Sequence, residues 1–228
     1  MRDIQHKGGP EYAYRLSIAP PRPDFTLRVL PDNPSIAPGD TAVLTAEAVR
    51  TDGFDGPIRL FLTELPKGFV AHGALIPSGQ SEVRFTLTAP ATVSPGLLTP
   101  SVSGTAHVDG RTVTRPAVPS EEVIQAFKPV HHVPTREFLL DVLKDPPPFT
   151  LSTSLPPDEV LVIQQNSEVQ LVVKATRREG IKGSIKLAAE APPKGLIVRT
   201  TSIGAEVSEA TVTLRTRQLP AGFAQNLI

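Results

Sequence analysis

The sequence predicts an all-β protein made of two tandem β-sandwiches. Three observations predict it: short segments in which apolar and polar residues alternate, turn residues that recur between them, and one 16-residue pattern that occurs twice. The pattern is "GFDGPIRLFLTELPKG" from Gly53 and "GIKGSIKLAAEAPPKG" from Gly180, 127 positions later (180 − 53). Proline supplies 25 of the 228 residues, about twice its usual share, which argues against long helices.

Alternation with a period of two defines the strands of the first copy. Successive residues of a strand face opposite sides of a sheet, so the apolar residues of each run are expected to point into the core. The runs, with the residues expected inside, are 24–30 (Phe25, Leu27, Val29), 41–49 (Val43 or Leu44), 57–62 (Ile58, Leu60, Leu62) and 81–89 (Val83, Phe85, Leu87).

The second copy repeats these runs in the same order, over residues 148–155, 167–177, 184–190 and 208–216. Seven of the 16 positions in the repeated pattern are identical, where about one is expected from average composition. They are turn glycines and prolines, one lysine, and apolar strand residues, so what repeats is a folding framework. The identities are Gly53/Gly180, Gly56/Gly183, Ile58/Ile185, Leu60/Leu187, Pro66/Pro193, Lys67/Lys194 and Gly68/Gly195.

The first copy continues beyond the repeated runs. Residues 99–118 are expected to form two strands around a hairpin turn at Asp109-Gly110. For residues 120–127 two alternatives stay open: one helical turn with Ser120 as N-cap, or a short strand. Residues 135–143 resemble a strand, and the prolines of residues 144–149 form a stiff linker.

The expected domain boundaries follow from these runs. Residues 1–23 are the tail strand of an upstream β domain or a linker, and residues 24–147 are the first sandwich with its extra hairpin and linker. Residues 148–228 are the second sandwich, which is expected to be truncated at its C-terminal end because the first copy still has a strand to run at that point.

Three stretches resemble known bacterial modules. "GGPEYAYRLSI" (residues 8–18) resembles the closing strand of the bacterial pre-peptidase C-terminal type domain. The repeats, in "GFDGPIRLFLTELPKGF" and "GIKGSIKLAAEAPPKGL", resemble the tandem immunoglobulin-like modules that follow such domains in large exported proteins. With neither Cys nor Trp, these modules would be of the disulfide-free kind. The resemblance implies an exported, multi-domain bacterial parent, and it transfers no catalytic residues.

Composition excludes several function classes. Lys plus Arg and Asp plus Glu both total 23, so no basic surface for nucleic acid is expected. No apolar run approaches the 18 or so residues of a membrane span, so membrane insertion is not expected. There is no cysteine, hence no disulfide or thiolate metal site, and no nucleotide-binding glycine motif, so no cofactor is expected.

Asp52 and Asp55, in "TDGFDG", are calcium candidates, because aspartates at nearby loop positions beside glycine are typical of calcium loops. The favoured interpretation is that both form turns. In the second copy Glu179 and Lys182 take their places, and a lysine there would repel a cation.

His131 and His132 are transition-metal candidates. They lie between two prolines in "FKPVHHVPT", which is expected to be a loop. If they were in a strand, neighbouring side chains would point to opposite faces, so a solvated or packed pair is favoured over a shared metal.

The sequence predicts a non-catalytic structural spacer or interaction module of a larger exported bacterial protein, located outside the cell, in the periplasm or at the cell surface. Its expected partners are the other domains of that parent. A module that binds a cell-surface glycan or protein is the alternative, and an accessory domain of a secreted hydrolase is the second alternative.

Overall fold

The computed structural model describes residues 18–124, 130–155, 160–190, 192–199, 201–219 and 226–227. The regular elements of this part of the chain are all strands, as the alternation predicts. Across the same residues, no helix is long and apolar enough to cross a membrane. The buried apolar side chains form two separate clusters, one before the proline linker and one after it.

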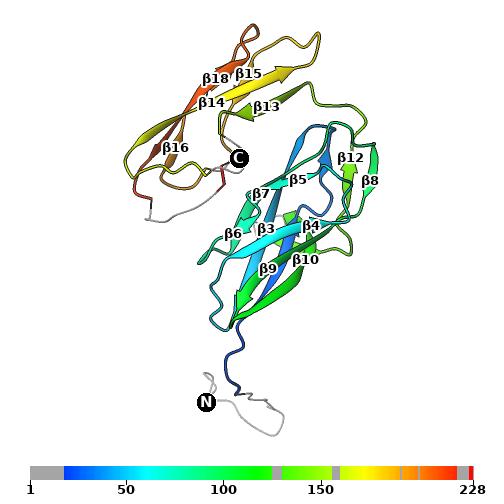
Figure 1. The fold of residues 1–228 in the computed structure, drawn as a ribbon, viewed down its shortest axis with the longest axis vertical. Helices are drawn as coiled ribbons and strands as arrows, with labels where there is room; N and C mark the ends of the chain where they lie inside the picture. The colour runs from blue at the N-terminus through cyan, green and yellow to red at the C-terminus, as the bar shows by residue number, and fades with distance from the viewer. Residues whose placement is uncertain are drawn as a thin grey trace.

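The first unit comprises β1 to β12, residues 24–143, and forms a sandwich of two sheets (Figure 1). One sheet has the strand order β5-β7-β3-β1-β10, and the other has the order β10-β9-β4-β6. Their inner faces pack Phe25, Leu27 and Phe85 against Ile58 and Ile76, all fully buried. The strands are β1 (Asp24–Leu30), β3 (Thr41–Thr51), β4 (Ile58–Thr63), β5 (Val70–His72), β6 (Leu75–Ile76), β7 (Glu82–Thr88), β9 (Ser101–Val108) and β10 (Arg111–Ile124).

Strand β10 belongs to both sheets and closes the sandwich along one side. Its first part pairs antiparallel with β9 across the hairpin at Asp109-Gly110, where both residues have positive φ (47° and 74°), as a tight two-residue turn requires. Its middle part pairs parallel with β1, for example Leu27 opposite Ala117. Its last part pairs antiparallel with β11 (Val130–Pro134).

A small three-stranded sheet completes the first unit. It has the order β2-β12-β8, with β2 at Ser35–Ile36, β12 at Leu140–Val142 and β8 at Gly96–Leu98. Phe138, Leu140 and Val142 are buried in the same core as β1 and β3. The chain up to residue 143 therefore contributes to the first core, although only three residues of the predicted 135–143 run form a strand.

The second unit comprises β13 to β18, residues 149–216 (Figure 1). Its larger sheet has the order β13-β14-β18-β16, and β15 pairs with β17 in a two-stranded sheet. The core contains Ile185, Leu187, Ile203 and Leu214, which are the counterparts, 127 positions on, of Ile58, Leu60, Ile76 and Leu87 in the first unit. The strands are β13 (Phe149–Thr153), β14 (Glu168–Arg177), β15 (Ile185–Leu187), β16 (Leu196–Val198), β17 (Thr201–Ile203) and β18 (Glu209–Thr216).

One local prediction is wrong and one alternative left open is settled, and both concern the same ribbon of β10 and β11. Residues 120–124 continue β10 as a strand rather than forming a helical turn, because Ser120 is fully buried and its backbone pairs with Pro134. The predicted loop around His131 and His132 is β11, the other half of that ribbon. Cross-strand pairing has overridden a local helix-capping signal and two flanking prolines.

The alternative left open between Val43 and Leu44 is settled within β3, and some of the predicted segments lie outside the described residues. Leu44, not Val43, points inward and is fully buried. Residues 8–17, which carry most of the pre-peptidase resemblance, and residues 125–127 lie outside the described residues.

Candidate functional site

The two calcium candidates accept hydrogen bonds from different segments of the chain. Asp52 has a positive φ of 50° in the turn after β3, and its Oδ2 accepts a hydrogen bond from the Arg22 amide at 2.8 Å. Asp55 accepts from the Gly79 amide at 2.9 Å through Oδ1 and from Ser78 Oγ at 3.2 Å through Oδ2. Across the described residues, no group of three or more His, Asp or Glu side chains could hold a metal. The contacts of Asp52 and Asp55 are those of turn-forming residues, and calcium binding stays a prediction.

The two histidines lie on opposite faces of the β10–β11 ribbon. His131 is exposed, whereas His132 is about one-fifth exposed and its Nδ1 lies 3.0 Å from Glu47 Oε2 on β3. Its Nε2 lies 4.0 Å from Glu122 Oε2 on β10. His132 therefore connects the β10–β11 ribbon to β3 of the main sheet. The two histidines do not point toward a common ligand.

A partly buried arginine organises the end of each sandwich. In the first unit, Arg50 at the end of β3 donates three hydrogen bonds to backbone carbonyls: Nη1 to Gly56 O at 2.6 Å, Nη2 to Pro77 O at 2.9 Å and Nε to Gln80 O at 3.0 Å. These carbonyls belong to the loop before β4 and the turn before β7. One side chain thus fixes two loops that join opposite sheets. We call this arrangement the arginine clamp.

The second unit contains the same clamp. Arg177, the counterpart of Arg50, donates to Gly183 O at 3.2 Å, Gly204 O at 2.7 Å and Val207 O at 2.6 Å. Each of these acceptors lies 127 positions after an acceptor of the first clamp, so the three acceptor carbonyls occupy matching places in the two units. Arg177 also donates to Ile203 O at 3.3 Å, but its buried Nε has no hydrogen-bond partner among the described residues.

The first clamp has an additional aromatic layer. The Arg50 guanidinium lies 5.1 Å from the ring centre of Phe54, which stacks on Phe25 at 5.4 Å. Burial lowers the pKa of Arg50 from its ordinary value, and the negative charge of Asp55 opposes this shift. In the second unit Ile181 stands at the place of Phe54 and is 42% exposed, so the second clamp is more open to water.

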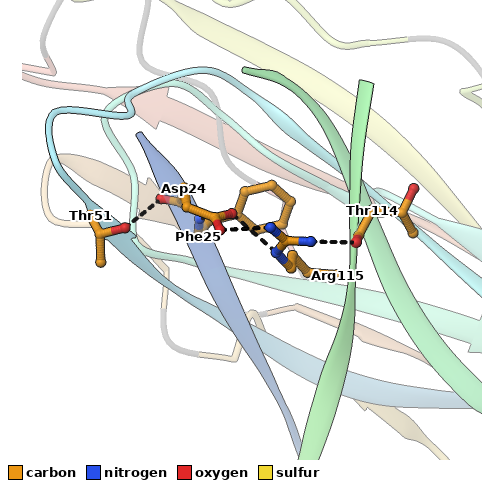
Figure 2. A network of polar contacts seen from close by, with 5 residues as sticks. All are labelled: Asp24, Phe25, Thr51, Thr114 and Arg115. Atoms are coloured by element: carbon orange, nitrogen blue, oxygen red, sulfur yellow. Dashed lines mark hydrogen bonds and ion pairs between the residues drawn. The ribbon is translucent and has the colours of Figure 1, made fainter. Parts of the chain in front are cut away.

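A polar network fixes the start of β1 in the first unit (Figure 2). Arg115 on β10 donates to both carboxylate oxygens of Asp24, through Nη2 at 2.6 Å and Nε at 3.1 Å, and Thr51 Oγ1 donates to Asp24 O at 3.1 Å. Hydrogen bonds from Arg115 and from the Phe25 amide hold the pKa of Asp24 below its usual value. The same ion pair raises the pKa of Arg115. Both side chains are about 40% exposed, so the pair anchors a strand end and is not an enclosed reactive site.

The two units touch through a small set of polar contacts. Arg84 on β7 pairs with the Glu190 carboxylate at 2.9 Å and donates to Glu190 O at 3.2 Å. Asn226 Nδ2 donates to Gly73 O at 2.8 Å and to Arg84 O at 2.6 Å. A side chain at position 73 would overlap Asn226, so the glycine leaves room for this contact. These four residues form the joint between the units.

A surface pocket of about 260 Å³ lies at the end of β18. Its lining residues are Asn166, Arg215, Thr216, Arg217 and Gln218, none of which carries a carboxylate or an imidazole. The lining therefore supplies neither of the groups most used for general acid–base chemistry.

The clamp and the joint were not predicted from the sequence, for different reasons. Arg50 and Arg177 occupy matching places in the two copies, and an identical arginine in a framework of turn and core residues was the available signal. The joint had no such signal, because Arg84 and Glu190 are 106 positions apart and neither belongs to a motif.

No family model matches the chain, and no curated protein matches it. Among solved structures, the chain is similar to the D00-D0 domain of Intimin, with a TM-score of 0.30 and 10% identity, over 85% of this chain and 86% of that one. A TM-score this low supports no argument about fold or function, so the interpretation depends on the contacts within the chain.

Proposed function

We propose that the chain is a non-catalytic spacer of an exported bacterial protein: two immunoglobulin-like domains, residues 24–147 and 148–228, that hold the flanking parts of that protein in a defined orientation. The observation that carries the proposal is the joint, in which Arg84 and Gly73 of the first unit meet Glu190 of the second unit and Asn226 of the segment after it. A spacer that only tethered its neighbours would need no such contact. The resemblance of residues 8–18 and of the repeats to modules of exported proteins supports the location.

The linker supports the same role. Pro146, Pro147 and Pro148 follow one another, and a run of prolines adopts a stiff, extended conformation. Arg178 binds this linker twice, donating from Nη1 to Pro146 O at 3.1 Å and from its amide to Pro148 O at 3.0 Å. The segment between the units is therefore fixed to the second unit, which leaves few bonds about which the units can rotate.

The joint is expected to be modest in strength. The Glu190 side chain is 69% exposed, so its ion pair with Arg84 contributes no more than about 1 kcal/mol. The hydrogen bonds of Asn226 and the stiff linker add to it. The combination restricts the angle between the units without making them one rigid body.

The test is a distance distribution between spin labels, one on each unit. The chain has no cysteine, so exposed Thr112 and Gln170 are replaced by cysteine and labelled without background. We expect a narrow distribution for the otherwise unchanged chain and a broad one when Glu190→Ala and Asn226→Ala are added. The control is Glu206→Ala, an exposed acid in the second unit outside the joint. A broad distribution without the joint substitutions would refute the spacer proposal.

A further inference from the structure

The equal totals of positive and negative residues conceal an uneven division of charge between the two units. Residues 24–147 contain 10 Lys and Arg against 14 Asp and Glu, whereas residues 148–228 contain 9 against 7. The second unit is therefore the positively charged one, and a surface that attracts anions is to be sought there rather than on the chain as a whole.

Three arginines of the second unit share the outer face of the sheet that contains β16 and β18 (Figure 1). Arg215 and Arg217 flank Thr216, which is buried, so both point away from the core. Arg199 directly follows β16, and its amide donates to Thr213 O on β18 at 3.2 Å, two residues before Arg215. Neighbours two positions along a strand, or diagonal across two strands, lie about 7 Å apart. We call Arg199, Arg215 and Arg217, all of which are exposed, the arginine face.

The charges of the arginine face are not neutralised within the part of the chain that the structure describes. None of the three side chains forms an ion pair or a hydrogen bond there, in contrast to Arg50 and Arg115. One carboxylate is near, because Glu168 on β14 lies opposite Arg215 in the sheet. One acid against three cations leaves a positive surface, and like charges at this spacing repel each other unless an anion lies among them.

The first unit has different residues at these places. The positions 127 residues earlier hold His72, Thr88 and Pro90, and Thr88 there forms a hydrogen bond with Thr41 across the sheet at 2.9 Å. The fold that the two units share therefore does not require arginine at these positions. This distinguishes the arginine face from the clamp arginines, which both units have and which serve folding.

The surface pocket at the end of β18 lies beside two of these arginines. Its lining adds the amides of Asn166 and Gln218 to the guanidinium groups of Arg215 and Arg217. Guanidinium groups donate paired hydrogen bonds to carboxylates, and amides both donate to and accept from hydroxyl groups. The volume of about 260 Å³ is smaller than the roughly 300–1,000 Å³ of a site for a complete drug-sized ligand, so the pocket suits one unit of a larger molecule.

The side chains around the arginine face select among anionic polymers. In the described part of the second unit the one aromatic residue, Phe149, packs against the core, so no ring is offered for the base stacking that binds single-stranded nucleic acid. Ile197, opposite Arg215 and 41% exposed, does not by itself make the cluster of aromatic and apolar anchors on which protein interfaces depend. Arginines beside amides fit a polymer that carries both carboxylates and hydroxyl groups.

We propose that the arginine face binds an acidic polysaccharide. Arg215 and Arg217 hold its carboxylates, Arg199 adds a third cation, and the pocket holds one sugar unit whose hydroxyl groups bind Asn166. Glu168 opposes binding, because its carboxylate repels those of the ligand. The site uses none of the residues of the joint, so this proposal and the spacer role can fail independently.

The test is isothermal titration calorimetry of polygalacturonate, in which each sugar unit carries a carboxylate, with the full 228-residue chain at low ionic strength. We expect binding that weakens as salt is added. Arg215→Ala and Arg217→Ala should each weaken it about fivefold, equivalent to about 1 kcal/mol, and both exposed positions should tolerate alanine without loss of the fold. The matched control is Lys186→Ala, which removes an exposed cation from β15 of the same unit and should weaken binding less than about twofold.

A variant of opposite sign guards against effects on folding. Glu168→Gln should tighten binding about twofold, and a damaged fold would not produce a gain in affinity. No binding of polygalacturonate would overturn the proposal, as would an equal loss of affinity in Lys186→Ala, which would show diffuse attraction by the whole unit. Equally tight binding of poly-L-glutamate would show that the partner is an acidic protein, and equally tight binding of uncharged dextran would show that the arginines do not take part.

Discussion

Replacing Arg50 by alanine should destabilise the first unit by about 3 kcal/mol. The side chain donates three hydrogen bonds to carbonyls, and hydrogen bonds from a charged donor contribute about 1.5–3 kcal/mol each. The low end applies, and the contributions do not add fully, because Arg50 is only partly buried and water can reach the loops once it is removed. Loss of the contact with Phe54 adds about 0.5 kcal/mol. For a unit of this size, the total corresponds to a fall in Tm of about 10 °C.

The assay is thermal and urea unfolding of the full chain, combined with hydrogen exchange to locate the effect. Exchange should accelerate in residues 76–81 with Arg50→Ala and in residues 203–208 with Arg177→Ala. The control is Arg59→Ala, which removes an exposed arginine from β4. Arg50→Lys should fall between wild type and Arg50→Ala, because one ammonium cannot reach all three carbonyls at once. If Arg50→Ala were no less stable than Arg59→Ala, the clamp would not support the fold and the reasoning would fail.

Three further predictions concern the first unit. His132→Ala should lower the free energy of unfolding by less than about 1 kcal/mol yet speed hydrogen exchange throughout β11, because it removes the contact with Glu47 on β3. His131→Ala, on the exposed face, should leave exchange in β11 unchanged. Equal exchange rates in the two variants would contradict a role of His132 in holding β11 to β3. Asp24→Asn should lower stability at neutral pH, because the lowered folded-state pKa makes the charged carboxylate stabilising above its unfolded value of about 3.9. That difference should vanish as pH falls through the folded-state pKa, and a difference that persisted in acid urea titrations would exclude the ion pair as its cause. Gly104→Val should cost about 1–3 kcal/mol or more through overpacking, while His107→Val on the outer face of the same strand should cost little, as measured by urea midpoints.

Long alternating runs were predictable from sequence because their burial is decided locally. The run at 24–30 became β1 with the same limits, and Phe25, Leu27 and Val29 are buried as predicted. The hairpin at Asp109-Gly110 was predictable for a similar reason, since positive φ at both turn residues restricts which amino acids fit.

Elements decided by distant partners were not predictable. The segment that includes Ser120 has a helix-capping signal, but its backbone pairs with a strand that follows it and the side chain is fully buried. The His131-His132 segment joins the same ribbon. The contacts of the candidate ligands were out of reach of local patterns as well, because Asp55 with Gly79 and His132 with Glu47 span 24 and 85 positions.

Comparing the two units distinguishes the residues that the fold requires from those that serve one unit alone. The clamp arginines, turn glycines and core leucines are shared, so they serve folding in both places. Arg84 is not shared: the residue 127 positions later is Thr211, which is exposed on β18. The second unit therefore lacks the cation with which the first unit forms the joint, so it cannot repeat that contact through its own β18.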